Sequence, residues 1–110
     1  MTAAGLCDAM RLIEEGQAIS REASKAMLDI LHQQRFRSGI PAGLPEDARV
    51  AHKTGEISTI AHDAGIVYIG ERDAYVVVIL TEWGPEVNGR QETIARISRA
   101  VYESMIRGAA

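Results

Sequence analysis

Two apolar runs in the second half of the chain give the clearest structural signal. Residues 64–69 and the run from Tyr75 to Leu80 are apolar at nearly every position and rich in β-branched side chains. Continuous runs of this kind are typical of strands covered on both faces, whereas half-exposed strands alternate. Polar residues 70–73 between the runs fit a tight turn. The pattern therefore predicts an antiparallel hairpin, with a third strand over residues 48–53.

Helical spacing of apolar residues predicts two helices before these strands. Thr2 and Ser20 are residue types that cap helix N-termini, and Gly16 can end the first helix. The second helix is expected to run to about His32. The inner stripes are expected to contain Leu6, Met10 and Ile13 in the first helix, and Ala23, Met27, Ile30 and Leu31 in the second.

The remaining segments predict a loop and one long helix. Residues 35–47 contain Pro41 and Pro45, which disfavour helix in the residues before them. After the hairpin, Pro85 is suited to the start of a helix that runs to about Arg107. Its inner face is expected to contain Ile94, Ile97, Val101 and Met105. The predicted fold class is α+β: two N-terminal helices, a three-stranded antiparallel sheet and a long C-terminal helix.

Composition narrows the possible functions. The 110 residues suffice for one domain or part of one. With 12 Lys and Arg against 15 Asp and Glu, the net charge is −3, which argues against a nucleic-acid partner. The sequence has neither an apolar run of membrane-spanning length nor the layout of a signal peptide. The single cysteine, Cys7, excludes an internal disulfide, so the compartment stays open.

The most distinctive chemistry lies at the end of the predicted third strand, in the sequence His52-Lys53-Thr54-Gly55. A cation and a hydroxyl side by side can bind a carboxylate, and a residue without a Cβ lets a ligand approach the backbone. A lysine on an edge strand also has a simpler use, because it prevents pairing with other chains.

At this point the sequence resembles a known family. Its order of segments is similar to the C-terminal portion of class A β-lactamases. That order is two helices, residues 31–43, His52-Lys53-Thr54-Gly55, the strand that begins at His62-Asp63, a second apolar strand and a terminal helix. It is equally similar to the related serine hydrolases with the penicillin-binding-protein fold. Lys-Thr-Gly belongs to the signature of this group. The resemblance implies that residues 1–110 form a single partial domain.

Two other parts of that signature are absent from the sequence. None of the six serines has lysine three positions later, so Ser-x-x-Lys is missing, and Ser-Asp-Asn is missing too. The carboxylate-bearing loop used for deacylation is also missing. Without a nucleophile, groups that stabilise an oxyanion have no transition state to act on. The chain alone is therefore predicted to be catalytically inactive, with no catalytic residue and no cofactor.

The resemblance implies roles for four residues. Lys53 would pair with a substrate carboxylate, Thr54 would donate its hydroxyl to the same group, and Gly55 would allow close backbone approach. The backbone N–H of Glu56 would be an oxyanion-hole donor. The Glu56 side chain departs from the family pattern, because it places a second carboxylate beside that of the substrate.

Several other groups have weaker functional interpretations. Cys7 lies beside the apolar stripe of the first helix and is interpreted as a buried thiol; no motif supports a nucleophilic pair with His62. His52, His62 and Asp63 are conceivable metal ligands but lack a further clustered ligand, so no metal site is predicted. Arg35 and Arg37 could contact an acidic partner.

Two hypotheses follow. In the first, the chain is a piece of a β-lactamase-like serine hydrolase whose parent acylates a serine with a β-lactam or a related amide; the start at Met1-Thr2, directly before a helix cap, favours a domain cut. In the second, it is a non-catalytic module for self-association or ligand binding.

Under both hypotheses, the run from Tyr75 to Leu80 would lack the neighbouring strand of the family, and it has no proline or lysine that would prevent pairing at its edge. A homodimer or larger oligomer is therefore expected, through this strand or through helix exchange.

Overall fold

The computed structural model describes residues 2–71 and 73–109. Along the chain, α1 (Ala3–Glu14) and α2 (Arg21–His32) are followed by the short 3₁₀ helix η1 (Ile40–Gly43). Three strands come next, β1 (Val50–Ile57), β2 (Ile60–Ile69) and β3 (Asp73–Glu82), and α3 (Arg90–Ala109) ends the chain. The predicted fold class is thus confirmed. The turn expected at residues 70–73 includes Arg72, which lies outside the described residues.

The three strands form one antiparallel sheet in the order β1-β2-β3. Val50 pairs with Val67 at one end of the first ladder, and Ile57 pairs with Ile60 at the other. In the second ladder, Gly65 pairs with Val77. Because helices cover both faces of the sheet at β2, its residues from Ala64 to Val67 are all buried, which explains the continuous apolar pattern of this strand.

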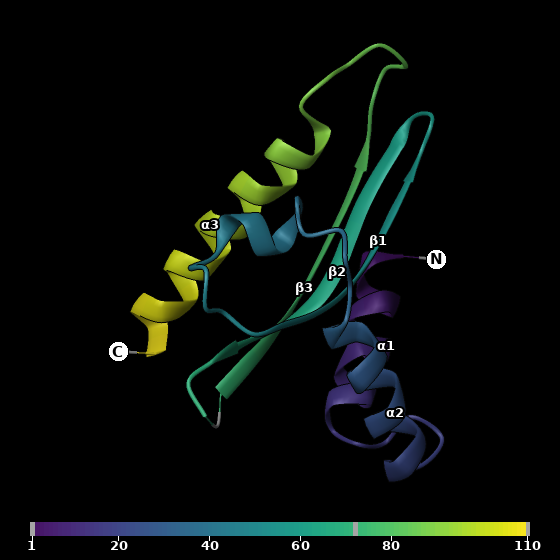
Figure 1. Cartoon of the computed structure of the whole chain (residues 1–110), viewed down its shortest axis with the longest axis vertical. Helices are drawn as coiled ribbons and strands as arrows, with labels where there is room; N and C mark the ends of the chain where they lie inside the picture. The colour runs from purple at the N-terminus through teal and green to yellow at the C-terminus, as the bar shows by residue number, and fades with distance from the viewer. Residues whose placement is uncertain (1, 72, 110) are drawn as a thin grey trace.

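Helices cover both faces of the sheet, with α3 on one side and α1 and α2 on the other (Figure 1). The core on the α3 side contains Ile40, Val50, Ala61, Val67, Tyr75, Val77, Ile79 and Ile94. The core on the other side contains Met10, Leu31, Ala51, Ala64 and Ile66. Side chains of a strand alternate between these two cores, so β2 contributes to both.

The predicted N-terminal caps are present at α1 and α2. The Thr2 hydroxyl accepts a hydrogen bond from the backbone N–H of Gly5 at 3.0 Å, and the Ser20 hydroxyl accepts one from Ala23 N at 3.0 Å. These bonds satisfy backbone donors that have no partner inside the helix. None of the helices in the described residues is long and apolar enough to span a membrane.

Several predicted boundaries and faces were wrong. β1 continues through residues 54–57 instead of ending at Lys53, because this segment pairs with the long strand β2 although Gly55 and Glu56 are residue types depleted in strands. α3 starts at Arg90 and not near Pro85: a turn over residues 84–89 precedes it, held by Arg90 side-chain bonds to Gly84 O and Val87 O.

The inner stripes of two helices were also partly wrong. Ile97 and Met105 are each 40% exposed, and the inner face of α3 instead includes buried Ser98 and half-buried Tyr102. Burial of this serine is tolerated because its hydroxyl donates to Ile40 O at 2.9 Å. In α2, Ile30 is 66% exposed whereas Leu31 is buried.

Candidate functional site

Lys53, Thr54 and Gly55 lie in the middle of β1, which is an edge strand among the described residues. Lys53 is exposed, and its ammonium group donates to the backbone oxygen of Thr54. Thr54 is half-buried and Gly55 is exposed. No atom outside the immediate neighbours lies within 4 Å of a Cβ added to Gly55 in the described structure. The backbone here therefore faces open space, into which a ligand can fit.

A pocket of about 390 Å³ opens over this part of β1. It is lined by Phe36, Ser38, Lys53, Thr54, Gly55, Glu56 and Gln91. All four residues singled out from the sequence thus line the same pocket. Its walls combine a cation, a carboxylate, two hydroxyls, an amide and an aromatic ring, which suits a small polar ligand with one apolar group.

Glu56 has a hydrogen-bond partner on α3. The side-chain Nε2 of Gln91 donates to Oε2 of Glu56 at 2.6 Å. Since Gln91 lies in the first turn of α3, this bond joins the far end of β1 to the helix. Gln91 Oε1 is buried and has no hydrogen-bond partner among the described residues.

A buried polar pair supports β1 next to Lys53. His52 and Asp63 are both fully buried, with 3.0 Å between His52 Nδ1 and Asp63 Oδ1. The second carboxylate oxygen of Asp63 accepts from the backbone N–H of Ile40 at 2.9 Å. A Cβ on Gly39 would lie 2.6 Å from that oxygen, so only glycine allows this approach. The pair joins β1, β2 and η1.

The other candidate metal-binding and nucleophilic residues of the sequence do not line the pocket over β1. His62 and Asp63 are successive residues of β2 and so face opposite sides of the sheet. His62 Nδ1 accepts from Thr81 N at 3.0 Å. Across the described residues, no group of three or more His, Cys, Asp or Glu side chains is arranged to hold a metal ion. Cys7 is half-buried on α1.

Three pocket residues were missed by the sequence analysis: Phe36, Ser38 and Gln91. Phe36 and Ser38 lie in the segment predicted as a loop, and Phe36 is 71% exposed. Gln91 is 36 positions from Gly55 and reaches the pocket only because α3, to which it belongs, packs against the sheet (Figure 1). The aromatic Phe36 between two arginines was a weak indication that this segment belongs to a binding site. No sequence feature indicated that Gln91 belongs to it.

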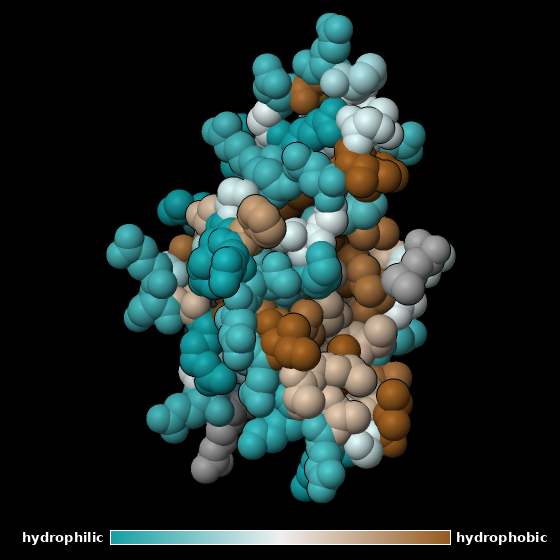
Figure 2. Space-filling model, turned by 45° about the vertical axis from the view of Figure 1, so that its right-hand side comes forward, coloured by the Kyte–Doolittle hydropathy of each residue, from teal (hydrophilic) through white to brown (hydrophobic). Residues whose placement is uncertain are grey.

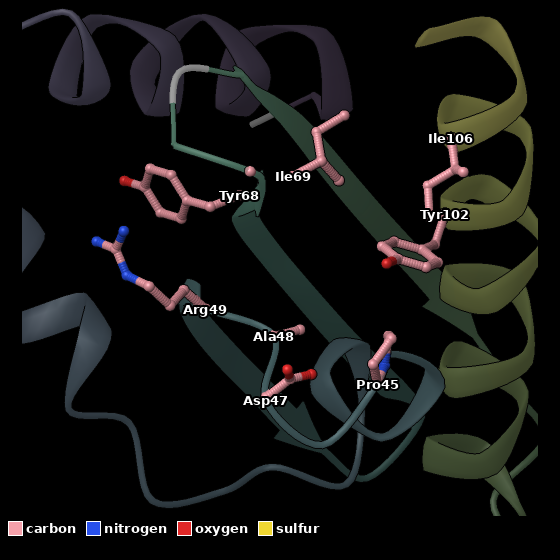
Figure 3. Close-up of a pocket in the computed structure, with 9 residues that line it drawn as sticks. Pro45, Asp47, Ala48, Arg49, Tyr68, Ile69, Tyr102 and Ile106 are labelled. Atoms are coloured by element: carbon pink, nitrogen blue, oxygen red, sulfur yellow. The ribbon is translucent and has the colours of Figure 1, made fainter. Parts of the chain in front are cut away.

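A second pocket, of about 410 Å³, lies at the opposite end of β1, between Arg49, Tyr68 and Tyr102 (Figure 3). The Tyr68 ring stacks on His32 with 5.4 Å between ring centroids, and the Arg49 guanidinium lies 4.7 Å from the Tyr68 centroid. The Tyr68 hydroxyl donates to Glu14 at 2.6 Å. The pKa of Tyr68 is raised, mainly by burial and to a lesser extent by the hydrogen bond to Glu14. Burial lowers the pKa of His32. These contacts join α1 and α2 to the sheet, and none involves the Lys-Thr-Gly sequence.

A three-stranded antiparallel sheet with helices on both faces and a long C-terminal helix is the arrangement of part of the β-lactamase-like fold. The chain belongs to the β-lactamase enzyme family, whose family model matches residues 1–105. No curated protein sequence matches it significantly.

Solved structures agree with this assignment. PBP-A is 30% identical over 93% of this chain, with a TM-score of 0.85. A β-lactamase from Sphaerobacter thermophilus DSM 20745 is 29% identical over 90% of the chain, with a TM-score of 0.81. A variant of the last common ancestor of Gram-negative class A β-lactamases is 25% identical over 98%, with a TM-score of 0.85. The chain covers 38%, 38% and 42% of these three structures, so it spans about two fifths of their length.

Proposed function

We propose that this chain supplies the substrate-binding strand of a β-lactamase-like serine hydrolase. Lys53 pairs with the carboxylate of a β-lactam or a related amide, and the Thr54 hydroxyl donates to the same group. Gly55 leaves room for the substrate along β1. The backbone N–H of Glu56 is one oxyanion-hole donor.

The observation that carries this proposal is the position of Lys53, Thr54 and Gly55 on an accessible edge of the sheet, in a chain of this family. All three line one pocket, and the space beside Gly55 is open. A structure of the L158E mutant of PBP-A, 30% identical to this chain, is described as an acyl-enzyme complex with penicillin G. A β-lactam is therefore the natural first ligand to test.

The proposal assigns no nucleophile to this chain. The sequence has no Ser-x-x-Lys, and two of its six serines, Ser24 and Ser98, are buried in hydrogen bonds to backbone groups. Chemistry would need a serine and its base from a further segment, as covalent catalysis requires both. The chain alone is expected to form no acyl adduct with penicillin G, as read by intact-protein mass spectrometry.

A chimera tests the proposal most fully. In it, this chain replaces the matching segment of PBP-A, and acylation by penicillin G is followed by mass spectrometry. Lys53→Ala should slow acylation about tenfold or more, because a hydrogen bond to a charged group contributes about 1.5–3 kcal/mol. Circular dichroism identifies chimeras that fold. If the folded chimera is acylated equally fast with and without the substitution, Lys53 does not bind the substrate and only prevents pairing of this edge strand with other chains.

A second candidate function, self-association without catalysis, is favoured by β3. Within the described residues this strand pairs with β2 on one side and with no strand on the other. Leu80 on this strand is 37% exposed, and apolar side chains gather on the face that carries α1 and α2 (Figure 2). An unpaired, unguarded edge is a template for pairing, and a second copy could satisfy it about a two-fold axis. Exchange of helices between two chains would be another route.

A further inference from the structure

Two side chains of opposite charge line the pocket over β1. Lys53 and Glu56 both line it, three residues apart on one strand. Neither residue takes part in an ion pair within 4 Å among the described residues, where the pairs are Arg11–Glu15, His52–Asp63 and Arg99–Glu103. Both charges are thus available to a ligand.

The Glu56 carboxylate accepts a hydrogen bond from α3. Gln91 Nε2 donates to one of its oxygens at 2.6 Å, and Gln91 is half-buried in the first turn of α3. The nearby cation Arg90 does not neutralise it directly. The Arg90 side chain donates instead to the backbone oxygens of Val87, Gly84 and Ile57, at 3.2, 3.1 and 3.4 Å.

The spacing of the two charges defines the kind of ligand that fits both. Three residues of a strand span roughly 10 Å, and Lys53 and Glu56 start on opposite faces of β1. Because β1 is an edge strand among the described residues, both side chains reach the pocket beside its free edge. A ligand that spans the site therefore meets a cation at one end and a carboxylate at the other.

We infer that Glu56, positioned by Gln91, makes this site selective for zwitterionic substrates: amides with a carboxylate for Lys53 and an ammonium group for Glu56. A substrate with only a carboxylate gains the contact with Lys53 but is repelled by Glu56. This inference rests on the proposed function, since it takes Lys53 as the carboxylate-binding group. It goes beyond that function by assigning the Glu56 side chain the choice between substrates.

Penicillin G and ampicillin are suitable probes, because they differ only in an α-ammonium group on the acyl side chain. Their binding to the intact chain is measured by ¹⁵N-resolved NMR titration, followed at the amides of Thr54 and Gly55. At about pH 6 the α-ammonium group of ampicillin is protonated. Ampicillin is expected to bind about two- to fivefold more tightly, the range typical of an exposed ion pair. High salt should reduce this ratio.

Two matched variants separate the inference from the proposed function. Glu56→Gln keeps the size of the side chain and an oxygen that accepts from Gln91, and it should bring the ratio close to one. Lys53→Ala should weaken both penicillins to the same extent. A ratio of one in the unmodified chain, or a preference that survives Glu56→Gln, would overturn the role of Glu56 and leave that of Lys53 intact. Unchanged binding of both probes in Lys53→Ala, or no binding of either up to about 20 mM, would overturn the proposed function and the inference together.

Discussion

His52 and Asp63 form a fully buried pair, with 3.0 Å between His52 Nδ1 and Asp63 Oδ1. His52 directly precedes Lys53, and the same Asp63 side chain accepts from Ile40 N. One carboxylate therefore joins the strand of the candidate site to its neighbour β2 and to η1. A buried polar group is tolerated when its partners are present, and is costly when one of them is removed.

The first prediction concerns this pair. Asp63→Ala should lower the free energy of unfolding by about 3–5 kcal/mol, because it leaves the His52 ring and the Ile40 N–H unpaired in the interior. Urea unfolding followed by circular dichroism measures the loss. Asp47→Ala, at an exposed carboxylate, is the control and should change stability by about 0.5 kcal/mol or less. Equal losses in the two variants would show that the pair contributes little.

Two glycines give a matched comparison of stability. A Cβ on Gly43 would lie 2.1 Å from Ala95 O, whereas a Cβ on Gly55 meets nothing within 4 Å in the described structure. Gly43→Ala should push η1 away from α3 and destabilise the fold by about 1–3 kcal/mol, as overpacking does. Gly55→Ala should leave thermal unfolding almost unchanged but weaken penicillin G binding. A strongly destabilised Gly55→Ala variant would mean that this glycine serves the fold and not a ligand.

The third prediction is a pH dependence of stability that depends on Tyr75. Burial raises the pKa of Tyr75 to about 12 from its ordinary value of 10.0. Between these values the folded state keeps a proton that the unfolded state releases, so stability falls as pH rises above 10. The Tyr75 hydroxyl is buried and has no hydrogen-bond partner among the described residues.

Tyr75→Phe should therefore cost little stability near neutral pH and should make the alkaline loss shallower. The measurement is the free energy of unfolding at about pH 8 and about pH 11 for both proteins. Tyr68, whose pKa is also raised, contributes to both curves and cancels in the comparison. Parallel losses in the two proteins would contradict burial of the Tyr75 hydroxyl.

Much of the fold was predictable from the sequence, because its signals are local. The apolar runs of β2 and β3 indicated strands, and the Thr2 and Ser20 caps are as expected. The end of β1 was not predictable in this way. Gly55 and Glu56 are residue types depleted in strands, and β1 continues through them because β2 pairs with this segment.

The site was only partly predictable for a related reason. Lys53, Thr54 and Gly55 are adjacent in sequence, so a motif reveals them. Gln91 and Phe36 reach the pocket through the packing of other segments, which leaves no local pattern. The buried His52–Asp63 pair was likewise hidden, since residues 11 positions apart meet only once β1 and β2 are in register.

Self-association through β3 can be tested at Leu80. Trp83 N donates to Thr59 O across the β2–β3 ladder, and bonding alternates along a strand, so the Leu80 N–H points away from β2. Leu80→Pro should thus block pairing at the open edge while it keeps the internal ladder. Light scattering after size exclusion should show a dimer or larger species for the unmodified chain and a folded monomer for the variant. A monomeric unmodified chain would disprove self-association, and a dimer that survives Leu80→Pro would place the interface on the helices.

The central claim is that the pocket over β1 binds a substrate carboxylate through Lys53. Its most direct measurement is the dissociation constant of penicillin G for the intact chain, from an NMR titration with the unmodified protein and with Lys53→Ala. We expect amide shifts confined to Thr54, Gly55 and Glu56, and binding about tenfold weaker in the variant, as for a lost charge-assisted contact. Equal dissociation constants for the two proteins, or shifts located instead near Tyr68 and Tyr102, would contradict the claim.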